Sequence, residues 1–452
     1  MCGIIGIYSN KNIAKELYYG LYSIQHRGQE SCGIAVVNDG KIKAIRQMGL
    51  VGDVFKEKEI DYLSGNIGIG HVRYSTAGGS VIQNCQPFVG TCRKRNLGLA
   101  HNGNLVNANY LKEMLEEDGL MFQTNSDTEV ILNILSRYYK GDIVQSIKLT
   151  MDYIKGAYSL VIFSDNELVA VRDPHGFRPL IMGKKDDEYI FASENCAIDI
   201  LGGEVIRDVE PGEIIVIKNG EMKSYNYSEH YKPVMRSCIF EHVYFARNDA
   251  TIDNLNAYEF RIKCGEKLAE SDDVKPDLVV PVPDSGWPGA LGYSNASGIR
   301  VSEALVKNRY VGRTFIKPTQ EEREIGVKIK LNPLKSMLKD KSIVLVDDSI
   351  VRGTTSRRLV QALREAGARE IHLRVTSPPV AYSCFYGIDT PNRENLLASN
   401  HNVEKMREHI GCDSLKFIDI DTMIEAAGGE NKFCKACFDG DYAVKLYDMQ
   451  SN

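Results

Sequence analysis

Residues 342–356 read SIVLVDDSIVRGTTS, and this stretch decides the fold of the second half of the chain. The apolar, β-branched run that opens it is typical of a buried strand, and Asp347 and Asp348 follow at the carboxyl end of that strand. A helix is expected to start near Ser356. Because ligands of open parallel sheets bind outside the carboxyl ends of the strands, the stretch predicts a ligand site on an α/β domain.

The loop between the two acids and the helix, Arg352-Gly353-Thr354-Thr355, has the composition of a phosphate site. Glycine lets backbone N–H groups approach an anion, and the N-terminus of the following helix favours negative charge. Adjacent carboxylates suit a hydrated divalent cation or the hydroxyls of a sugar. We therefore predict a sugar phosphate bound with Mg²⁺. The alternative is a solvated strand end followed by an ordinary helix cap.

Further apolar runs extend this prediction along the second half of the chain. Residues 277–286 and 370–379 each contain an apolar run that ends in a polar loop, and helical patterns lie between them. Such alternation predicts a parallel sheet that is covered by helices on both faces. A change in composition places the start of this domain near residue 230.

The first half of the chain has a different pattern. Short strands are separated by turns expected at Asp39-Gly40 and Asn102-Gly103, and helices are expected over 108–118 and 126–139. These elements predict an α+β domain with two antiparallel sheets.

Length and composition limit the functional classes. The 452 residues predict two or three domains. The formal net charge of −5 argues against a general affinity for nucleic acid or anionic membranes, since both select a basic surface. No transmembrane run or signal-peptide pattern occurs, so we expect a cytoplasmic protein. In that reducing compartment, the 11 cysteines are not expected to form disulfides, and metal-binding or catalytic roles are favoured.

Residues 344–356, VLVDDSIVRGTTS, resemble the phosphoribosyl-diphosphate signature of the type I phosphoribosyltransferases. The resemblance implies that Asp347 and Asp348 hold the ribose hydroxyls, directly or through Mg²⁺. It implies that Ser285, in VVPVPDSGW, approaches the diphosphate and the metal. The residues implied to cradle the 5′-phosphate are Arg352, Gly353, Thr354 and Thr355.

Residues 309–333 form a basic segment in this acidic chain. In the phosphoribosyltransferases that the chain resembles, this region is a loop that closes over the diphosphate, which would exclude water from a reactive anomeric centre. The resemblance implies that Lys317 and Lys328 contact phosphoribosyl diphosphate. The alternative is an ordinary charged surface loop.

Cys2 directly follows Met1 and precedes Gly3. A small second residue permits removal of the initiator, which would expose Cys2 with a free α-amine. Such an amine has an ordinary pKa of about 7.7–8.0 and can act as a base toward its own thiol. By itself, a cysteine at position 2 has little meaning.

The motifs MCGIIGIY, QHRGQES, HVRYSTAG, AHNGNLVN and TNSDTE follow one another along the chain. This set resembles the class II glutamine amidotransferases, whose mature N-terminal cysteine is the nucleophile. The resemblance implies that Cys2 attacks the glutamine amide, and that Asn102 and the backbone N–H of Gly103 form the oxyanion hole. It implies that Arg73 binds the α-carboxylate of glutamine and that Asp127 binds its α-ammonium. The motif residues expected to support the structure are His26, Arg27 and His101.

Cys434 and Cys437 form a C-x-x-C pair, and Cys238 and Cys384 precede it. One such pair leaves zinc, redox chemistry and chance open. The segments RSCIFEHVYFAR, SPPVAYSCFYGID and CKACFDGDY resemble those of iron–sulfur amidotransferases, which implies a [4Fe–4S] cluster on these thiolates, either structural or oxygen-sensing. A Cys₄ zinc site is the alternative. The cysteines expected as free thiols are Cys32, Cys85, Cys92, Cys196, Cys264 and Cys412.

Across nearly the whole chain, the motifs resemble the iron–sulfur subgroup of the glutamine phosphoribosylpyrophosphate amidotransferases. The resemblance implies a four-layer αββα N-terminal-nucleophile domain over residues 2–230 and an α/β type I phosphoribosyltransferase domain with a cluster-binding tail over 231–452. It implies release of ammonia from glutamine and its transfer to C1 of phosphoribosyl diphosphate, the first step of purine synthesis. The expected products are 5-phosphoribosylamine, glutamate and diphosphate. Inhibition by purine nucleotides and a homotetramer or homodimer are expected on the same ground.

The chain departs from the pattern of that family at several positions. Asn248 and Ala250 replace the usual proline and serine of one motif, and Trp287 and Pro288 directly follow the diphosphate loop. Cluster-containing relatives often carry a short propeptide, whereas Met1 alone precedes Cys2 here, so we expect maturation to need only an aminopeptidase.

Two other functions remain as alternatives. Another class II amidotransferase, such as an aminosugar synthase, would carry an isomerase fold and would lack the signature at 344–356. A non-catalytic regulator that binds phosphoribosyl diphosphate would not need Cys2, Arg73, Asn102 and Asp127 together.

Overall fold

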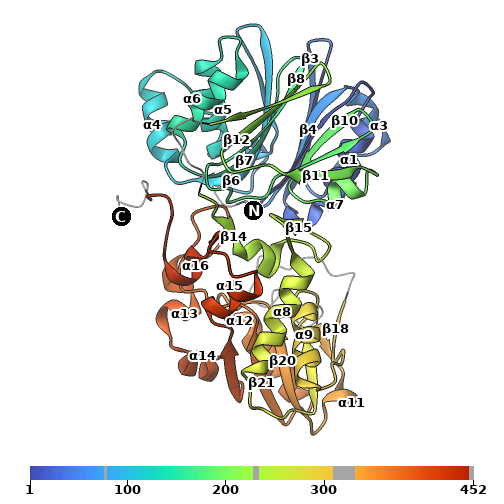
Figure 1. The fold of residues 1–452 in the computed structure, drawn as a ribbon, viewed down its shortest axis with the longest axis vertical. Helices are drawn as coiled ribbons and strands as arrows, with labels where there is room; N and C mark the ends of the chain where they lie inside the picture. Colours follow the sequence, from blue (N-terminus) through green and yellow to red (C-terminus); the bar gives the residue numbers. More distant parts are fainter. Residues whose placement is uncertain (76–78, 228–233, 309–330, 447–452) are drawn as a thin grey trace.

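The computed structural model describes residues 1–75, 79–227, 234–308 and 331–446. In Figure 1 the first half of the chain forms the upper lobe and the second half forms the lower lobe, and the N-terminus lies between them. None of the described helices is long and apolar enough to cross a membrane.

The first sheet of the upper lobe is antiparallel throughout and has the N-terminal strand near its centre. A turn at Asp39-Gly40, with positive φ at both residues, joins two of its strands and confirms the predicted hairpin. In sheet order the strands are β11 (Glu204–Asp208), β9 (Ile181–Lys185), β10 (Glu188–Ala192), β1 (Gly3–Tyr8), β4 (Ile67–Arg73), β2 (Ser31–Asn38) and β3 (Lys41–Met48).

The second sheet of the upper lobe is also antiparallel and packs against the first. The apolar core between the two sheets includes Ile4 and Ile69 from the first sheet and Val161 and Ile215 from the second. In sheet order the strands are β13 (Glu221–Asn226), β12 (Glu213–Lys218), β8 (Glu167–Arg172), β7 (Gly156–Phe163), β6 (Arg95–Leu105) and β5 (Phe88–Cys92).

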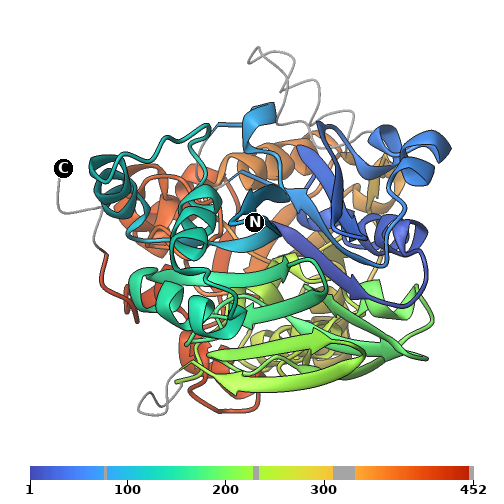
Figure 2. The same ribbon diagram turned by 90° about the horizontal axis from the view of Figure 1, so that it is seen from above.

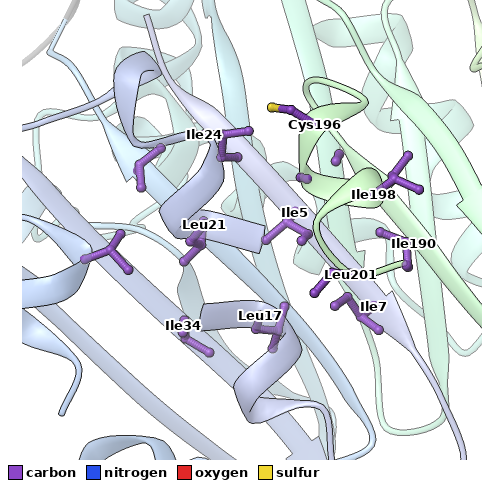
Figure 3. Close-up of a cluster of buried hydrophobic side chains, with 14 of the residues drawn as sticks. Ile5, Ile7, Leu17, Leu21, Ile24, Ile34, Ile190, Cys196, Ile198 and Leu201 are labelled. Atoms are coloured by element: carbon purple, nitrogen blue, oxygen red, sulfur yellow. The ribbon is translucent and has the colours of Figure 1, made fainter. Parts of the chain in front are cut away.

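Helices cover the outer faces of both sheets and complete the predicted αββα layers, as the view from above shows (Figure 2). Leu17 and Leu21 of α1 point toward Ile5 and Ile7 of β1 (Figure 3). A Cβ at Gly20 would lie 2.2 Å from Ile5, so glycine allows this helix to approach the sheet closely. The helices on the first sheet are α1 (Ala14–Ser23), α2 (Val51–Val54), α3 (Glu57–Tyr62) and α7 (Cys196–Asp199). Those on the second sheet are α4 (Ala108–Glu117), α5 (Asp127–Tyr138) and α6 (Ile143–Tyr153).

The lower lobe contains the predicted parallel sheet, with apolar cores on both of its faces. In sheet order its strands are β17 (Leu278–Pro281), β20 (Ser342–Asp347), β21 (Glu370–Val375) and β22 (Ser414–Phe417). The longer helices of this lobe are α8 (Ala257–Glu270), α9 (Trp287–Ser297), α12 (Thr354–Glu365), α14 (Val403–Ile410) and α15 (Ile420–Ala426).

Short elements connect these layers and carry several of the predicted site residues. The short strands are β14 (Ser237–Cys238), β15 (Thr251–Ile252), β16 (Leu255–Asn256), β18 (Leu305–Lys307), β19 (Leu331–Pro333) and β23 (Phe433–Cys434). The short helices are α11 (Lys335–Leu338), α13 (Leu397–Asn400), α16 (Ala436–Asp439) and the turns η1 (Gln25–Arg27), η2 (Ile82–Asn84), η3 (Glu241–Phe245) and η5 (Arg393–Asn395).

One predicted turn is wrong. Asn102 and Gly103 lie inside β6, where they pair with Ser159 and Tyr158 of β7. Asn-Gly is a strong local turn signal, but here the backbone hydrogen bonds of the sheet outweigh it. Glycine is needed for packing instead, because a Cβ at Gly103 would lie 2.0 Å from the carbonyl oxygen of Ala157.

The helix after the two acids begins at Thr354, two residues before the predicted start, because Gly353 takes a left-handed conformation and ends the loop there. The two predicted helices of the first half are confirmed as α4 and α5, and Ser126 caps α5 by accepting a hydrogen bond from the N–H of Thr128. The predicted boundary near residue 230 lies outside the described residues and stays a prediction.

A buried histidine makes the stability of the upper lobe depend on pH. Burial, together with the charge of Arg73, lowers the pKa of His71 to about 3. His71 of the unfolded chain takes up a proton near pH 6.5, whereas His71 of the folded chain does not. Its contribution to the free energy of unfolding is therefore fully present above pH 6.5 and is lost on acidification. We expect His71→Gln to reduce the loss of unfolding free energy between pH 7 and pH 5, measured in urea, by about 1.4 kcal/mol per pH unit below 6.5.

The exposed His401 supplies the matched control, and His401→Gln should leave the pH dependence as it is in the original chain. An unchanged pH dependence in His71→Gln would contradict the prediction.

Candidate active sites

Cys2 immediately precedes β1, and the hydrogen bonds of that strand to β4 and β10 hold it near the centre of the first sheet. Its Sγ lies 3.6 Å from the carbonyl oxygen of Tyr74, and its backbone N–H donates to Oδ1 of Asn102 at 3.2 Å. The thiol is buried. The tertiary structure thus brings together the predicted nucleophile and the predicted oxyanion-hole residue from positions 2 and 102.

The side-chain amide of Asn102 supports the predicted oxyanion hole. Its Oδ1 is occupied by the N–H of Cys2, whereas its Nδ2 is buried and has no hydrogen-bond partner among the described residues. A buried donor without an acceptor is costly, and it is satisfied if an oxyanion forms next to it. Gly103 follows on the same strand, so its backbone N–H belongs to the same region.

Met1 is buried next to the nucleophile. Its amine donates to the carbonyl oxygen of Tyr74 at 3.2 Å, and its Sδ lies 2.9 Å from Nη2 of Arg27. Burial lowers the pKa of this amine to about 6. Removal of Met1 stays a prediction.

Arg73 and Asp127 flank this region. Arg73 ends β4, directly before Tyr74, and its Nη1 donates to the carbonyl oxygen of Gly79 at 3.1 Å. Asp127 begins α5 and accepts a hydrogen bond from the N–H of Leu105 at 3.0 Å. The predicted partners for the two charges of an amino acid are thus a buried guanidinium and a buried carboxylate.

The charges around Asp127 keep it ionised. Burial would raise the pKa of its carboxyl group, but His101 at 3.6 Å and hydrogen bonds from the N–H groups of Leu105 and Thr128 lower the pKa below its usual range. An ionised carboxylate suits an α-ammonium group. His101 thus has the supporting position that the sequence predicts.

Arg27 contacts the nucleophile itself, which the sequence did not predict. Its Nε donates to the carbonyl oxygen of Cys2 at 3.0 Å. The remaining guanidinium nitrogens contact Glu194 and Glu241, and His26 also lies 2.8 Å from Glu194. No local pattern indicates these two glutamates, because they lie 167 and 214 positions after Arg27.

The predicted phosphate site forms at the carboxyl ends of β17 and β20. Ser285 donates from its hydroxyl to Asp348, and the N–H of Asp348 donates to Asp347 at 3.0 Å. Burial raises the pKa of both acids, and the neighbouring charge of Asp348 raises the pKa of Asp347 further. Two adjacent acids whose ionisation is opposed by burial fit a site that receives a divalent cation.

The loop after these acids has the geometry that an anion site needs. Gly353 has a φ of +74°, and α12 starts at the next residue, so Thr354 and Thr355 form its first turn. A Cβ at Gly353 would lie 2.6 Å from Cδ2 of Leu397, and a residue with a side chain would be strained in this left-handed conformation, so both contact and backbone favour glycine here. Arg352 precedes this turn, and the structure therefore brings together the residues predicted to cradle a phosphate.

Two further contacts of the lower lobe were not predicted from the sequence. Lys307 pairs with Asp284 of the predicted diphosphate loop. Asn248, one of the departures from the family pattern, accepts a hydrogen bond from Nη1 of the buried Arg261 at 2.6 Å. Lys317 and Lys328 lie outside the described residues.

The four cysteines predicted as cluster ligands line one cavity. It is otherwise bounded largely by apolar and aromatic side chains, which include Phe177, Phe240, Tyr386 and Tyr442. The parallel pairing of β14 with β23 puts two of the cysteines opposite one another, and the N–H of Tyr386 donates to Sγ of a third at 3.3 Å. The cysteines of the cavity are Cys238, Cys384, Cys434 and Cys437.

The donor atoms of this cavity are sulfurs, which iron and zinc take as ligands after loss of their protons. Burial raises the pKa of Cys238, Cys434 and Cys437, so free thiols are held protonated there, and a bound metal would replace those protons. Every cysteine of the chain is a free thiol in the structure. Within the described residues, no group of three or more histidine, cysteine or acidic side chains is arranged to hold a metal ion, so the cysteines surround the cavity without meeting at one point.

Two family models match the chain. A glutamine amidotransferase domain matches residues 71–199, and a phosphoribosyl transferase domain matches residues 252–377. The fold and the two sites therefore define a two-domain protein that joins a glutamine amidotransferase domain to a phosphoribosyltransferase domain with a parallel sheet.

The chain belongs to the amidophosphoribosyltransferase family. It is 49% identical over 451 residues to the amidophosphoribosyltransferase of Methanothermobacter thermautotrophicus, covering 98% of this chain and 95% of that protein. It is 44% identical to the Bacillus subtilis amidophosphoribosyltransferase, covering 99% of this chain and 94% of that protein. A solved structure of the B. subtilis glutamine phosphoribosylpyrophosphate amidotransferase complexed with ADP and GMP matches with a TM-score of 0.93 at 43% identity, covering 99% of this chain and 98% of that one.

The acid pair gives a direct test of the phosphate site. We expect Asp348→Asn to weaken the binding of phosphoribosyl diphosphate with Mg²⁺ about tenfold or more, because the variant removes a buried charge that the cation would neutralise. The amide can still accept the hydrogen bond from Ser285. The dissociation constant is measured by calorimetry, with the exposed Asp340→Asn as the control. An unchanged affinity in Asp348→Asn would exclude the predicted role.

Proposed function

We propose that this chain hydrolyses glutamine at Cys2 and transfers the ammonia to C1 of phosphoribosyl diphosphate. The products would be 5-phosphoribosylamine, glutamate and diphosphate, which is the first step of purine synthesis in the family. The observation that carries the proposal is Nδ2 of Asn102 beside Cys2, which has no hydrogen-bond partner among the described residues, in a chain whose other lobe holds the buried pair Asp347 and Asp348.

The first half-reaction requires the free α-amine of Cys2, which takes the proton of the thiol. Sulfur then forms a bond to the amide carbon of glutamine, and the negative charge on oxygen is held by Nδ2 of Asn102 and the N–H of Gly103. The C–N bond breaks, and ammonia leaves with the proton from the amine. Water then attacks the thioester, which restores the thiol and releases glutamate.

The substrate is held by charge. Arg73 binds the α-carboxylate of glutamine, and Asp127 binds the α-ammonium. These contacts give the amide a fixed orientation toward Sγ of Cys2, which makes attack effectively unimolecular.

In the second half-reaction, the lone pair of ammonia forms a bond to C1 as the bond from C1 to the diphosphate oxygen breaks. Asp347, Asp348 and Ser285 would hold Mg²⁺ and orient the ribose. Bound Mg²⁺ supplies charge stabilisation on the leaving diphosphate. The residues proposed for the 5′-phosphate are Arg352, Gly353, Thr354 and Thr355, and those proposed for the diphosphate are Lys317 and Lys328.

Ammonia must pass between the lobes without taking up a proton, because ammonium has no lone pair. A path that excludes water is therefore part of the proposal. The position of the N-terminus at the junction of the lobes supports this path (Figure 1).

A [4Fe–4S] cluster on Cys238, Cys384, Cys434 and Cys437 is also proposed. The apolar cavity that these four thiols share supports it. The cluster would join the C-terminal strand β23 to β14, and neither half-reaction moves electrons, so a structural or oxygen-sensing role fits best.

Regulation and assembly follow from the family. The related B. subtilis enzyme has been solved in complex with ADP and GMP, which supports purine nucleotides as inhibitors of this chain. A homotetramer or homodimer, a cytoplasmic location and a domain boundary near residue 230 are proposed with them.

Cys2→Ala tests the nucleophile. With glutamine as nitrogen source, we expect diphosphate release to fall at least a thousandfold, because no thioester can form. With ammonium chloride at high pH, the same variant should retain the activity of the original chain. Cys92→Ala, whose thiol contacts the carbonyl oxygen of Ser136, is the matched control. No diphosphate release from the original chain with either nitrogen source would overturn the transferase assignment.

Iron and sulfide analysis tests the proposed cluster. Protein purified without oxygen should be brown and contain about four iron and four sulfide ions per chain. Cys384→Ser should lower both contents, whereas Cys412→Ser, which changes a buried thiol outside the cavity, should not. Colourless protein with zinc bound to the same four residues would favour the Cys₄ zinc site.

A further inference from the structure

A cluster of buried charges lies between the two lobes, next to the N-terminus. Arg27 and Glu194 come from the upper lobe, and Glu241 belongs to η3, which follows β14. Arg178 completes the cluster by donating to Oε1 of Glu241 at 2.9 Å. All four side chains are 1% exposed or less, so their charges can be balanced only by each other and by adjacent groups.

Every guanidinium nitrogen of Arg27 donates to an oxygen, and Nη2 also contacts Sδ of Met1 at 2.9 Å. Nε donates to the carbonyl oxygen of Cys2 at 3.0 Å, Nη1 donates to Glu194, and Nη2 donates to Glu241 at 2.6 Å. A planar guanidinium held at three corners cannot rotate without losing a charged contact. The orientation of Nε toward Cys2 therefore depends on both carboxylates.

Glu241 is the carboxylate that ties this arrangement to the rest of the molecule. Its Oε1 accepts hydrogen bonds from both Arg27 and Arg178, and its Oε2 has no partner among the described residues. Burial alone would raise the pKa of Glu241, but the two guanidinium groups hold the pKa below its usual range. The side chain is thus a buried carboxylate that stays ionised because it is shared by two arginines.

The segment around Glu241 is anchored from both sides. Three residues before Glu241, the N–H of Cys238 donates to the carbonyl oxygen of Phe177. On the other side, Nε of Arg261 donates to the carbonyl oxygen of His242 at 2.8 Å, and its Nη2 donates to that of Ala246 at 2.8 Å. Glu241 therefore has a fixed backbone position from which to hold Arg27.

We propose that Glu241 is a positioning residue for glutamine hydrolysis, which fixes Cys2 for attack through Arg27. The proposal rests on the proposed function. The side chain of Glu241 donates no proton to the reaction and acts through the guanidinium of Arg27, which holds the carbonyl oxygen of Cys2. If Cys2 were displaced, the site would bind glutamine as before, but the thiol would attack more slowly, because a small error in the position of a nucleophile costs much of its reactivity.

Glu241→Gln tests the proposal, because the variant keeps the shape of the side chain and removes its charge. We expect kcat for glutamine-dependent diphosphate release to fall at least tenfold, with the KM for glutamine and the ammonia-dependent rate within twofold of the original chain. Glu241→Asp keeps the charge but is too short to reach both arginines. Its kcat with glutamine should lie between those of the original chain and Glu241→Gln, and it carries the test if Glu241→Gln fails to fold.

Glu213→Gln is the matched control. Glu213 is also buried and pairs with an arginine, Arg207, at 2.6 Å, but that pair contacts neither Cys2 nor Arg27. All variants are compared for folding by urea unfolding. The proposal is overturned if a folded Glu241 variant retains kcat with glutamine, or if it loses the glutamine- and ammonia-dependent rates equally. If the original chain shows no diphosphate release with either nitrogen source, the proposed function fails instead.

Discussion

Buried ion pairs between the lobes fix the relation of the two sites. Arg27 and Arg178 of the upper lobe share Glu241, and Arg172 contacts both carboxylate oxygens of Asp253 at 2.8 Å. A buried arginine without a carboxylate is strongly unfavourable, so the lobes are held in the one arrangement that pairs these charges. The position of Cys2 depends on the same pairs, because Arg27 holds its carbonyl oxygen.

The two sites use different structural principles. The glutamine site lies on antiparallel strands, where sheet hydrogen bonds set the position of the nucleophile and of Asn102. The predicted phosphate site lies at the end of a parallel strand, where a loop leads into a helix N-terminus, the kind of position that favours an anion. The loop that carries Cys384 adjoins the first of these sites: Asn104 donates to the carbonyl oxygen of Phe385 at 3.1 Å, and a Cβ at Gly387 would lie 3.1 Å from the backbone of Gly103.

Local patterns predicted the secondary structure where burial and turn chemistry agreed. The hairpin at Asp39-Gly40 and the strand that ends at Asp347 are confirmed. The turn at Asn102-Gly103 is wrong because pairing with a distant strand outweighs local preference. Arg27 was expected to support the structure, and it does so by direct contact with Cys2. Glu194 and Glu241 could not be predicted, since a lone glutamate in a sequence does not show which arginine it will meet.

The sequence by itself determined the class of each domain, because strand periodicity and loop composition are local properties of the chain. The site residues were predicted from the resemblance of its motifs to known families. Tertiary structure alone decided which of these residues meet. Contacts such as those of Cys2 with Asn102 and of Arg27 with Glu241 join positions separated by 100 and 214 residues. Such contacts form only when sheets and lobes pack, since the cost of burying charge and polar groups is met by partners that the fold, and not the local sequence, supplies.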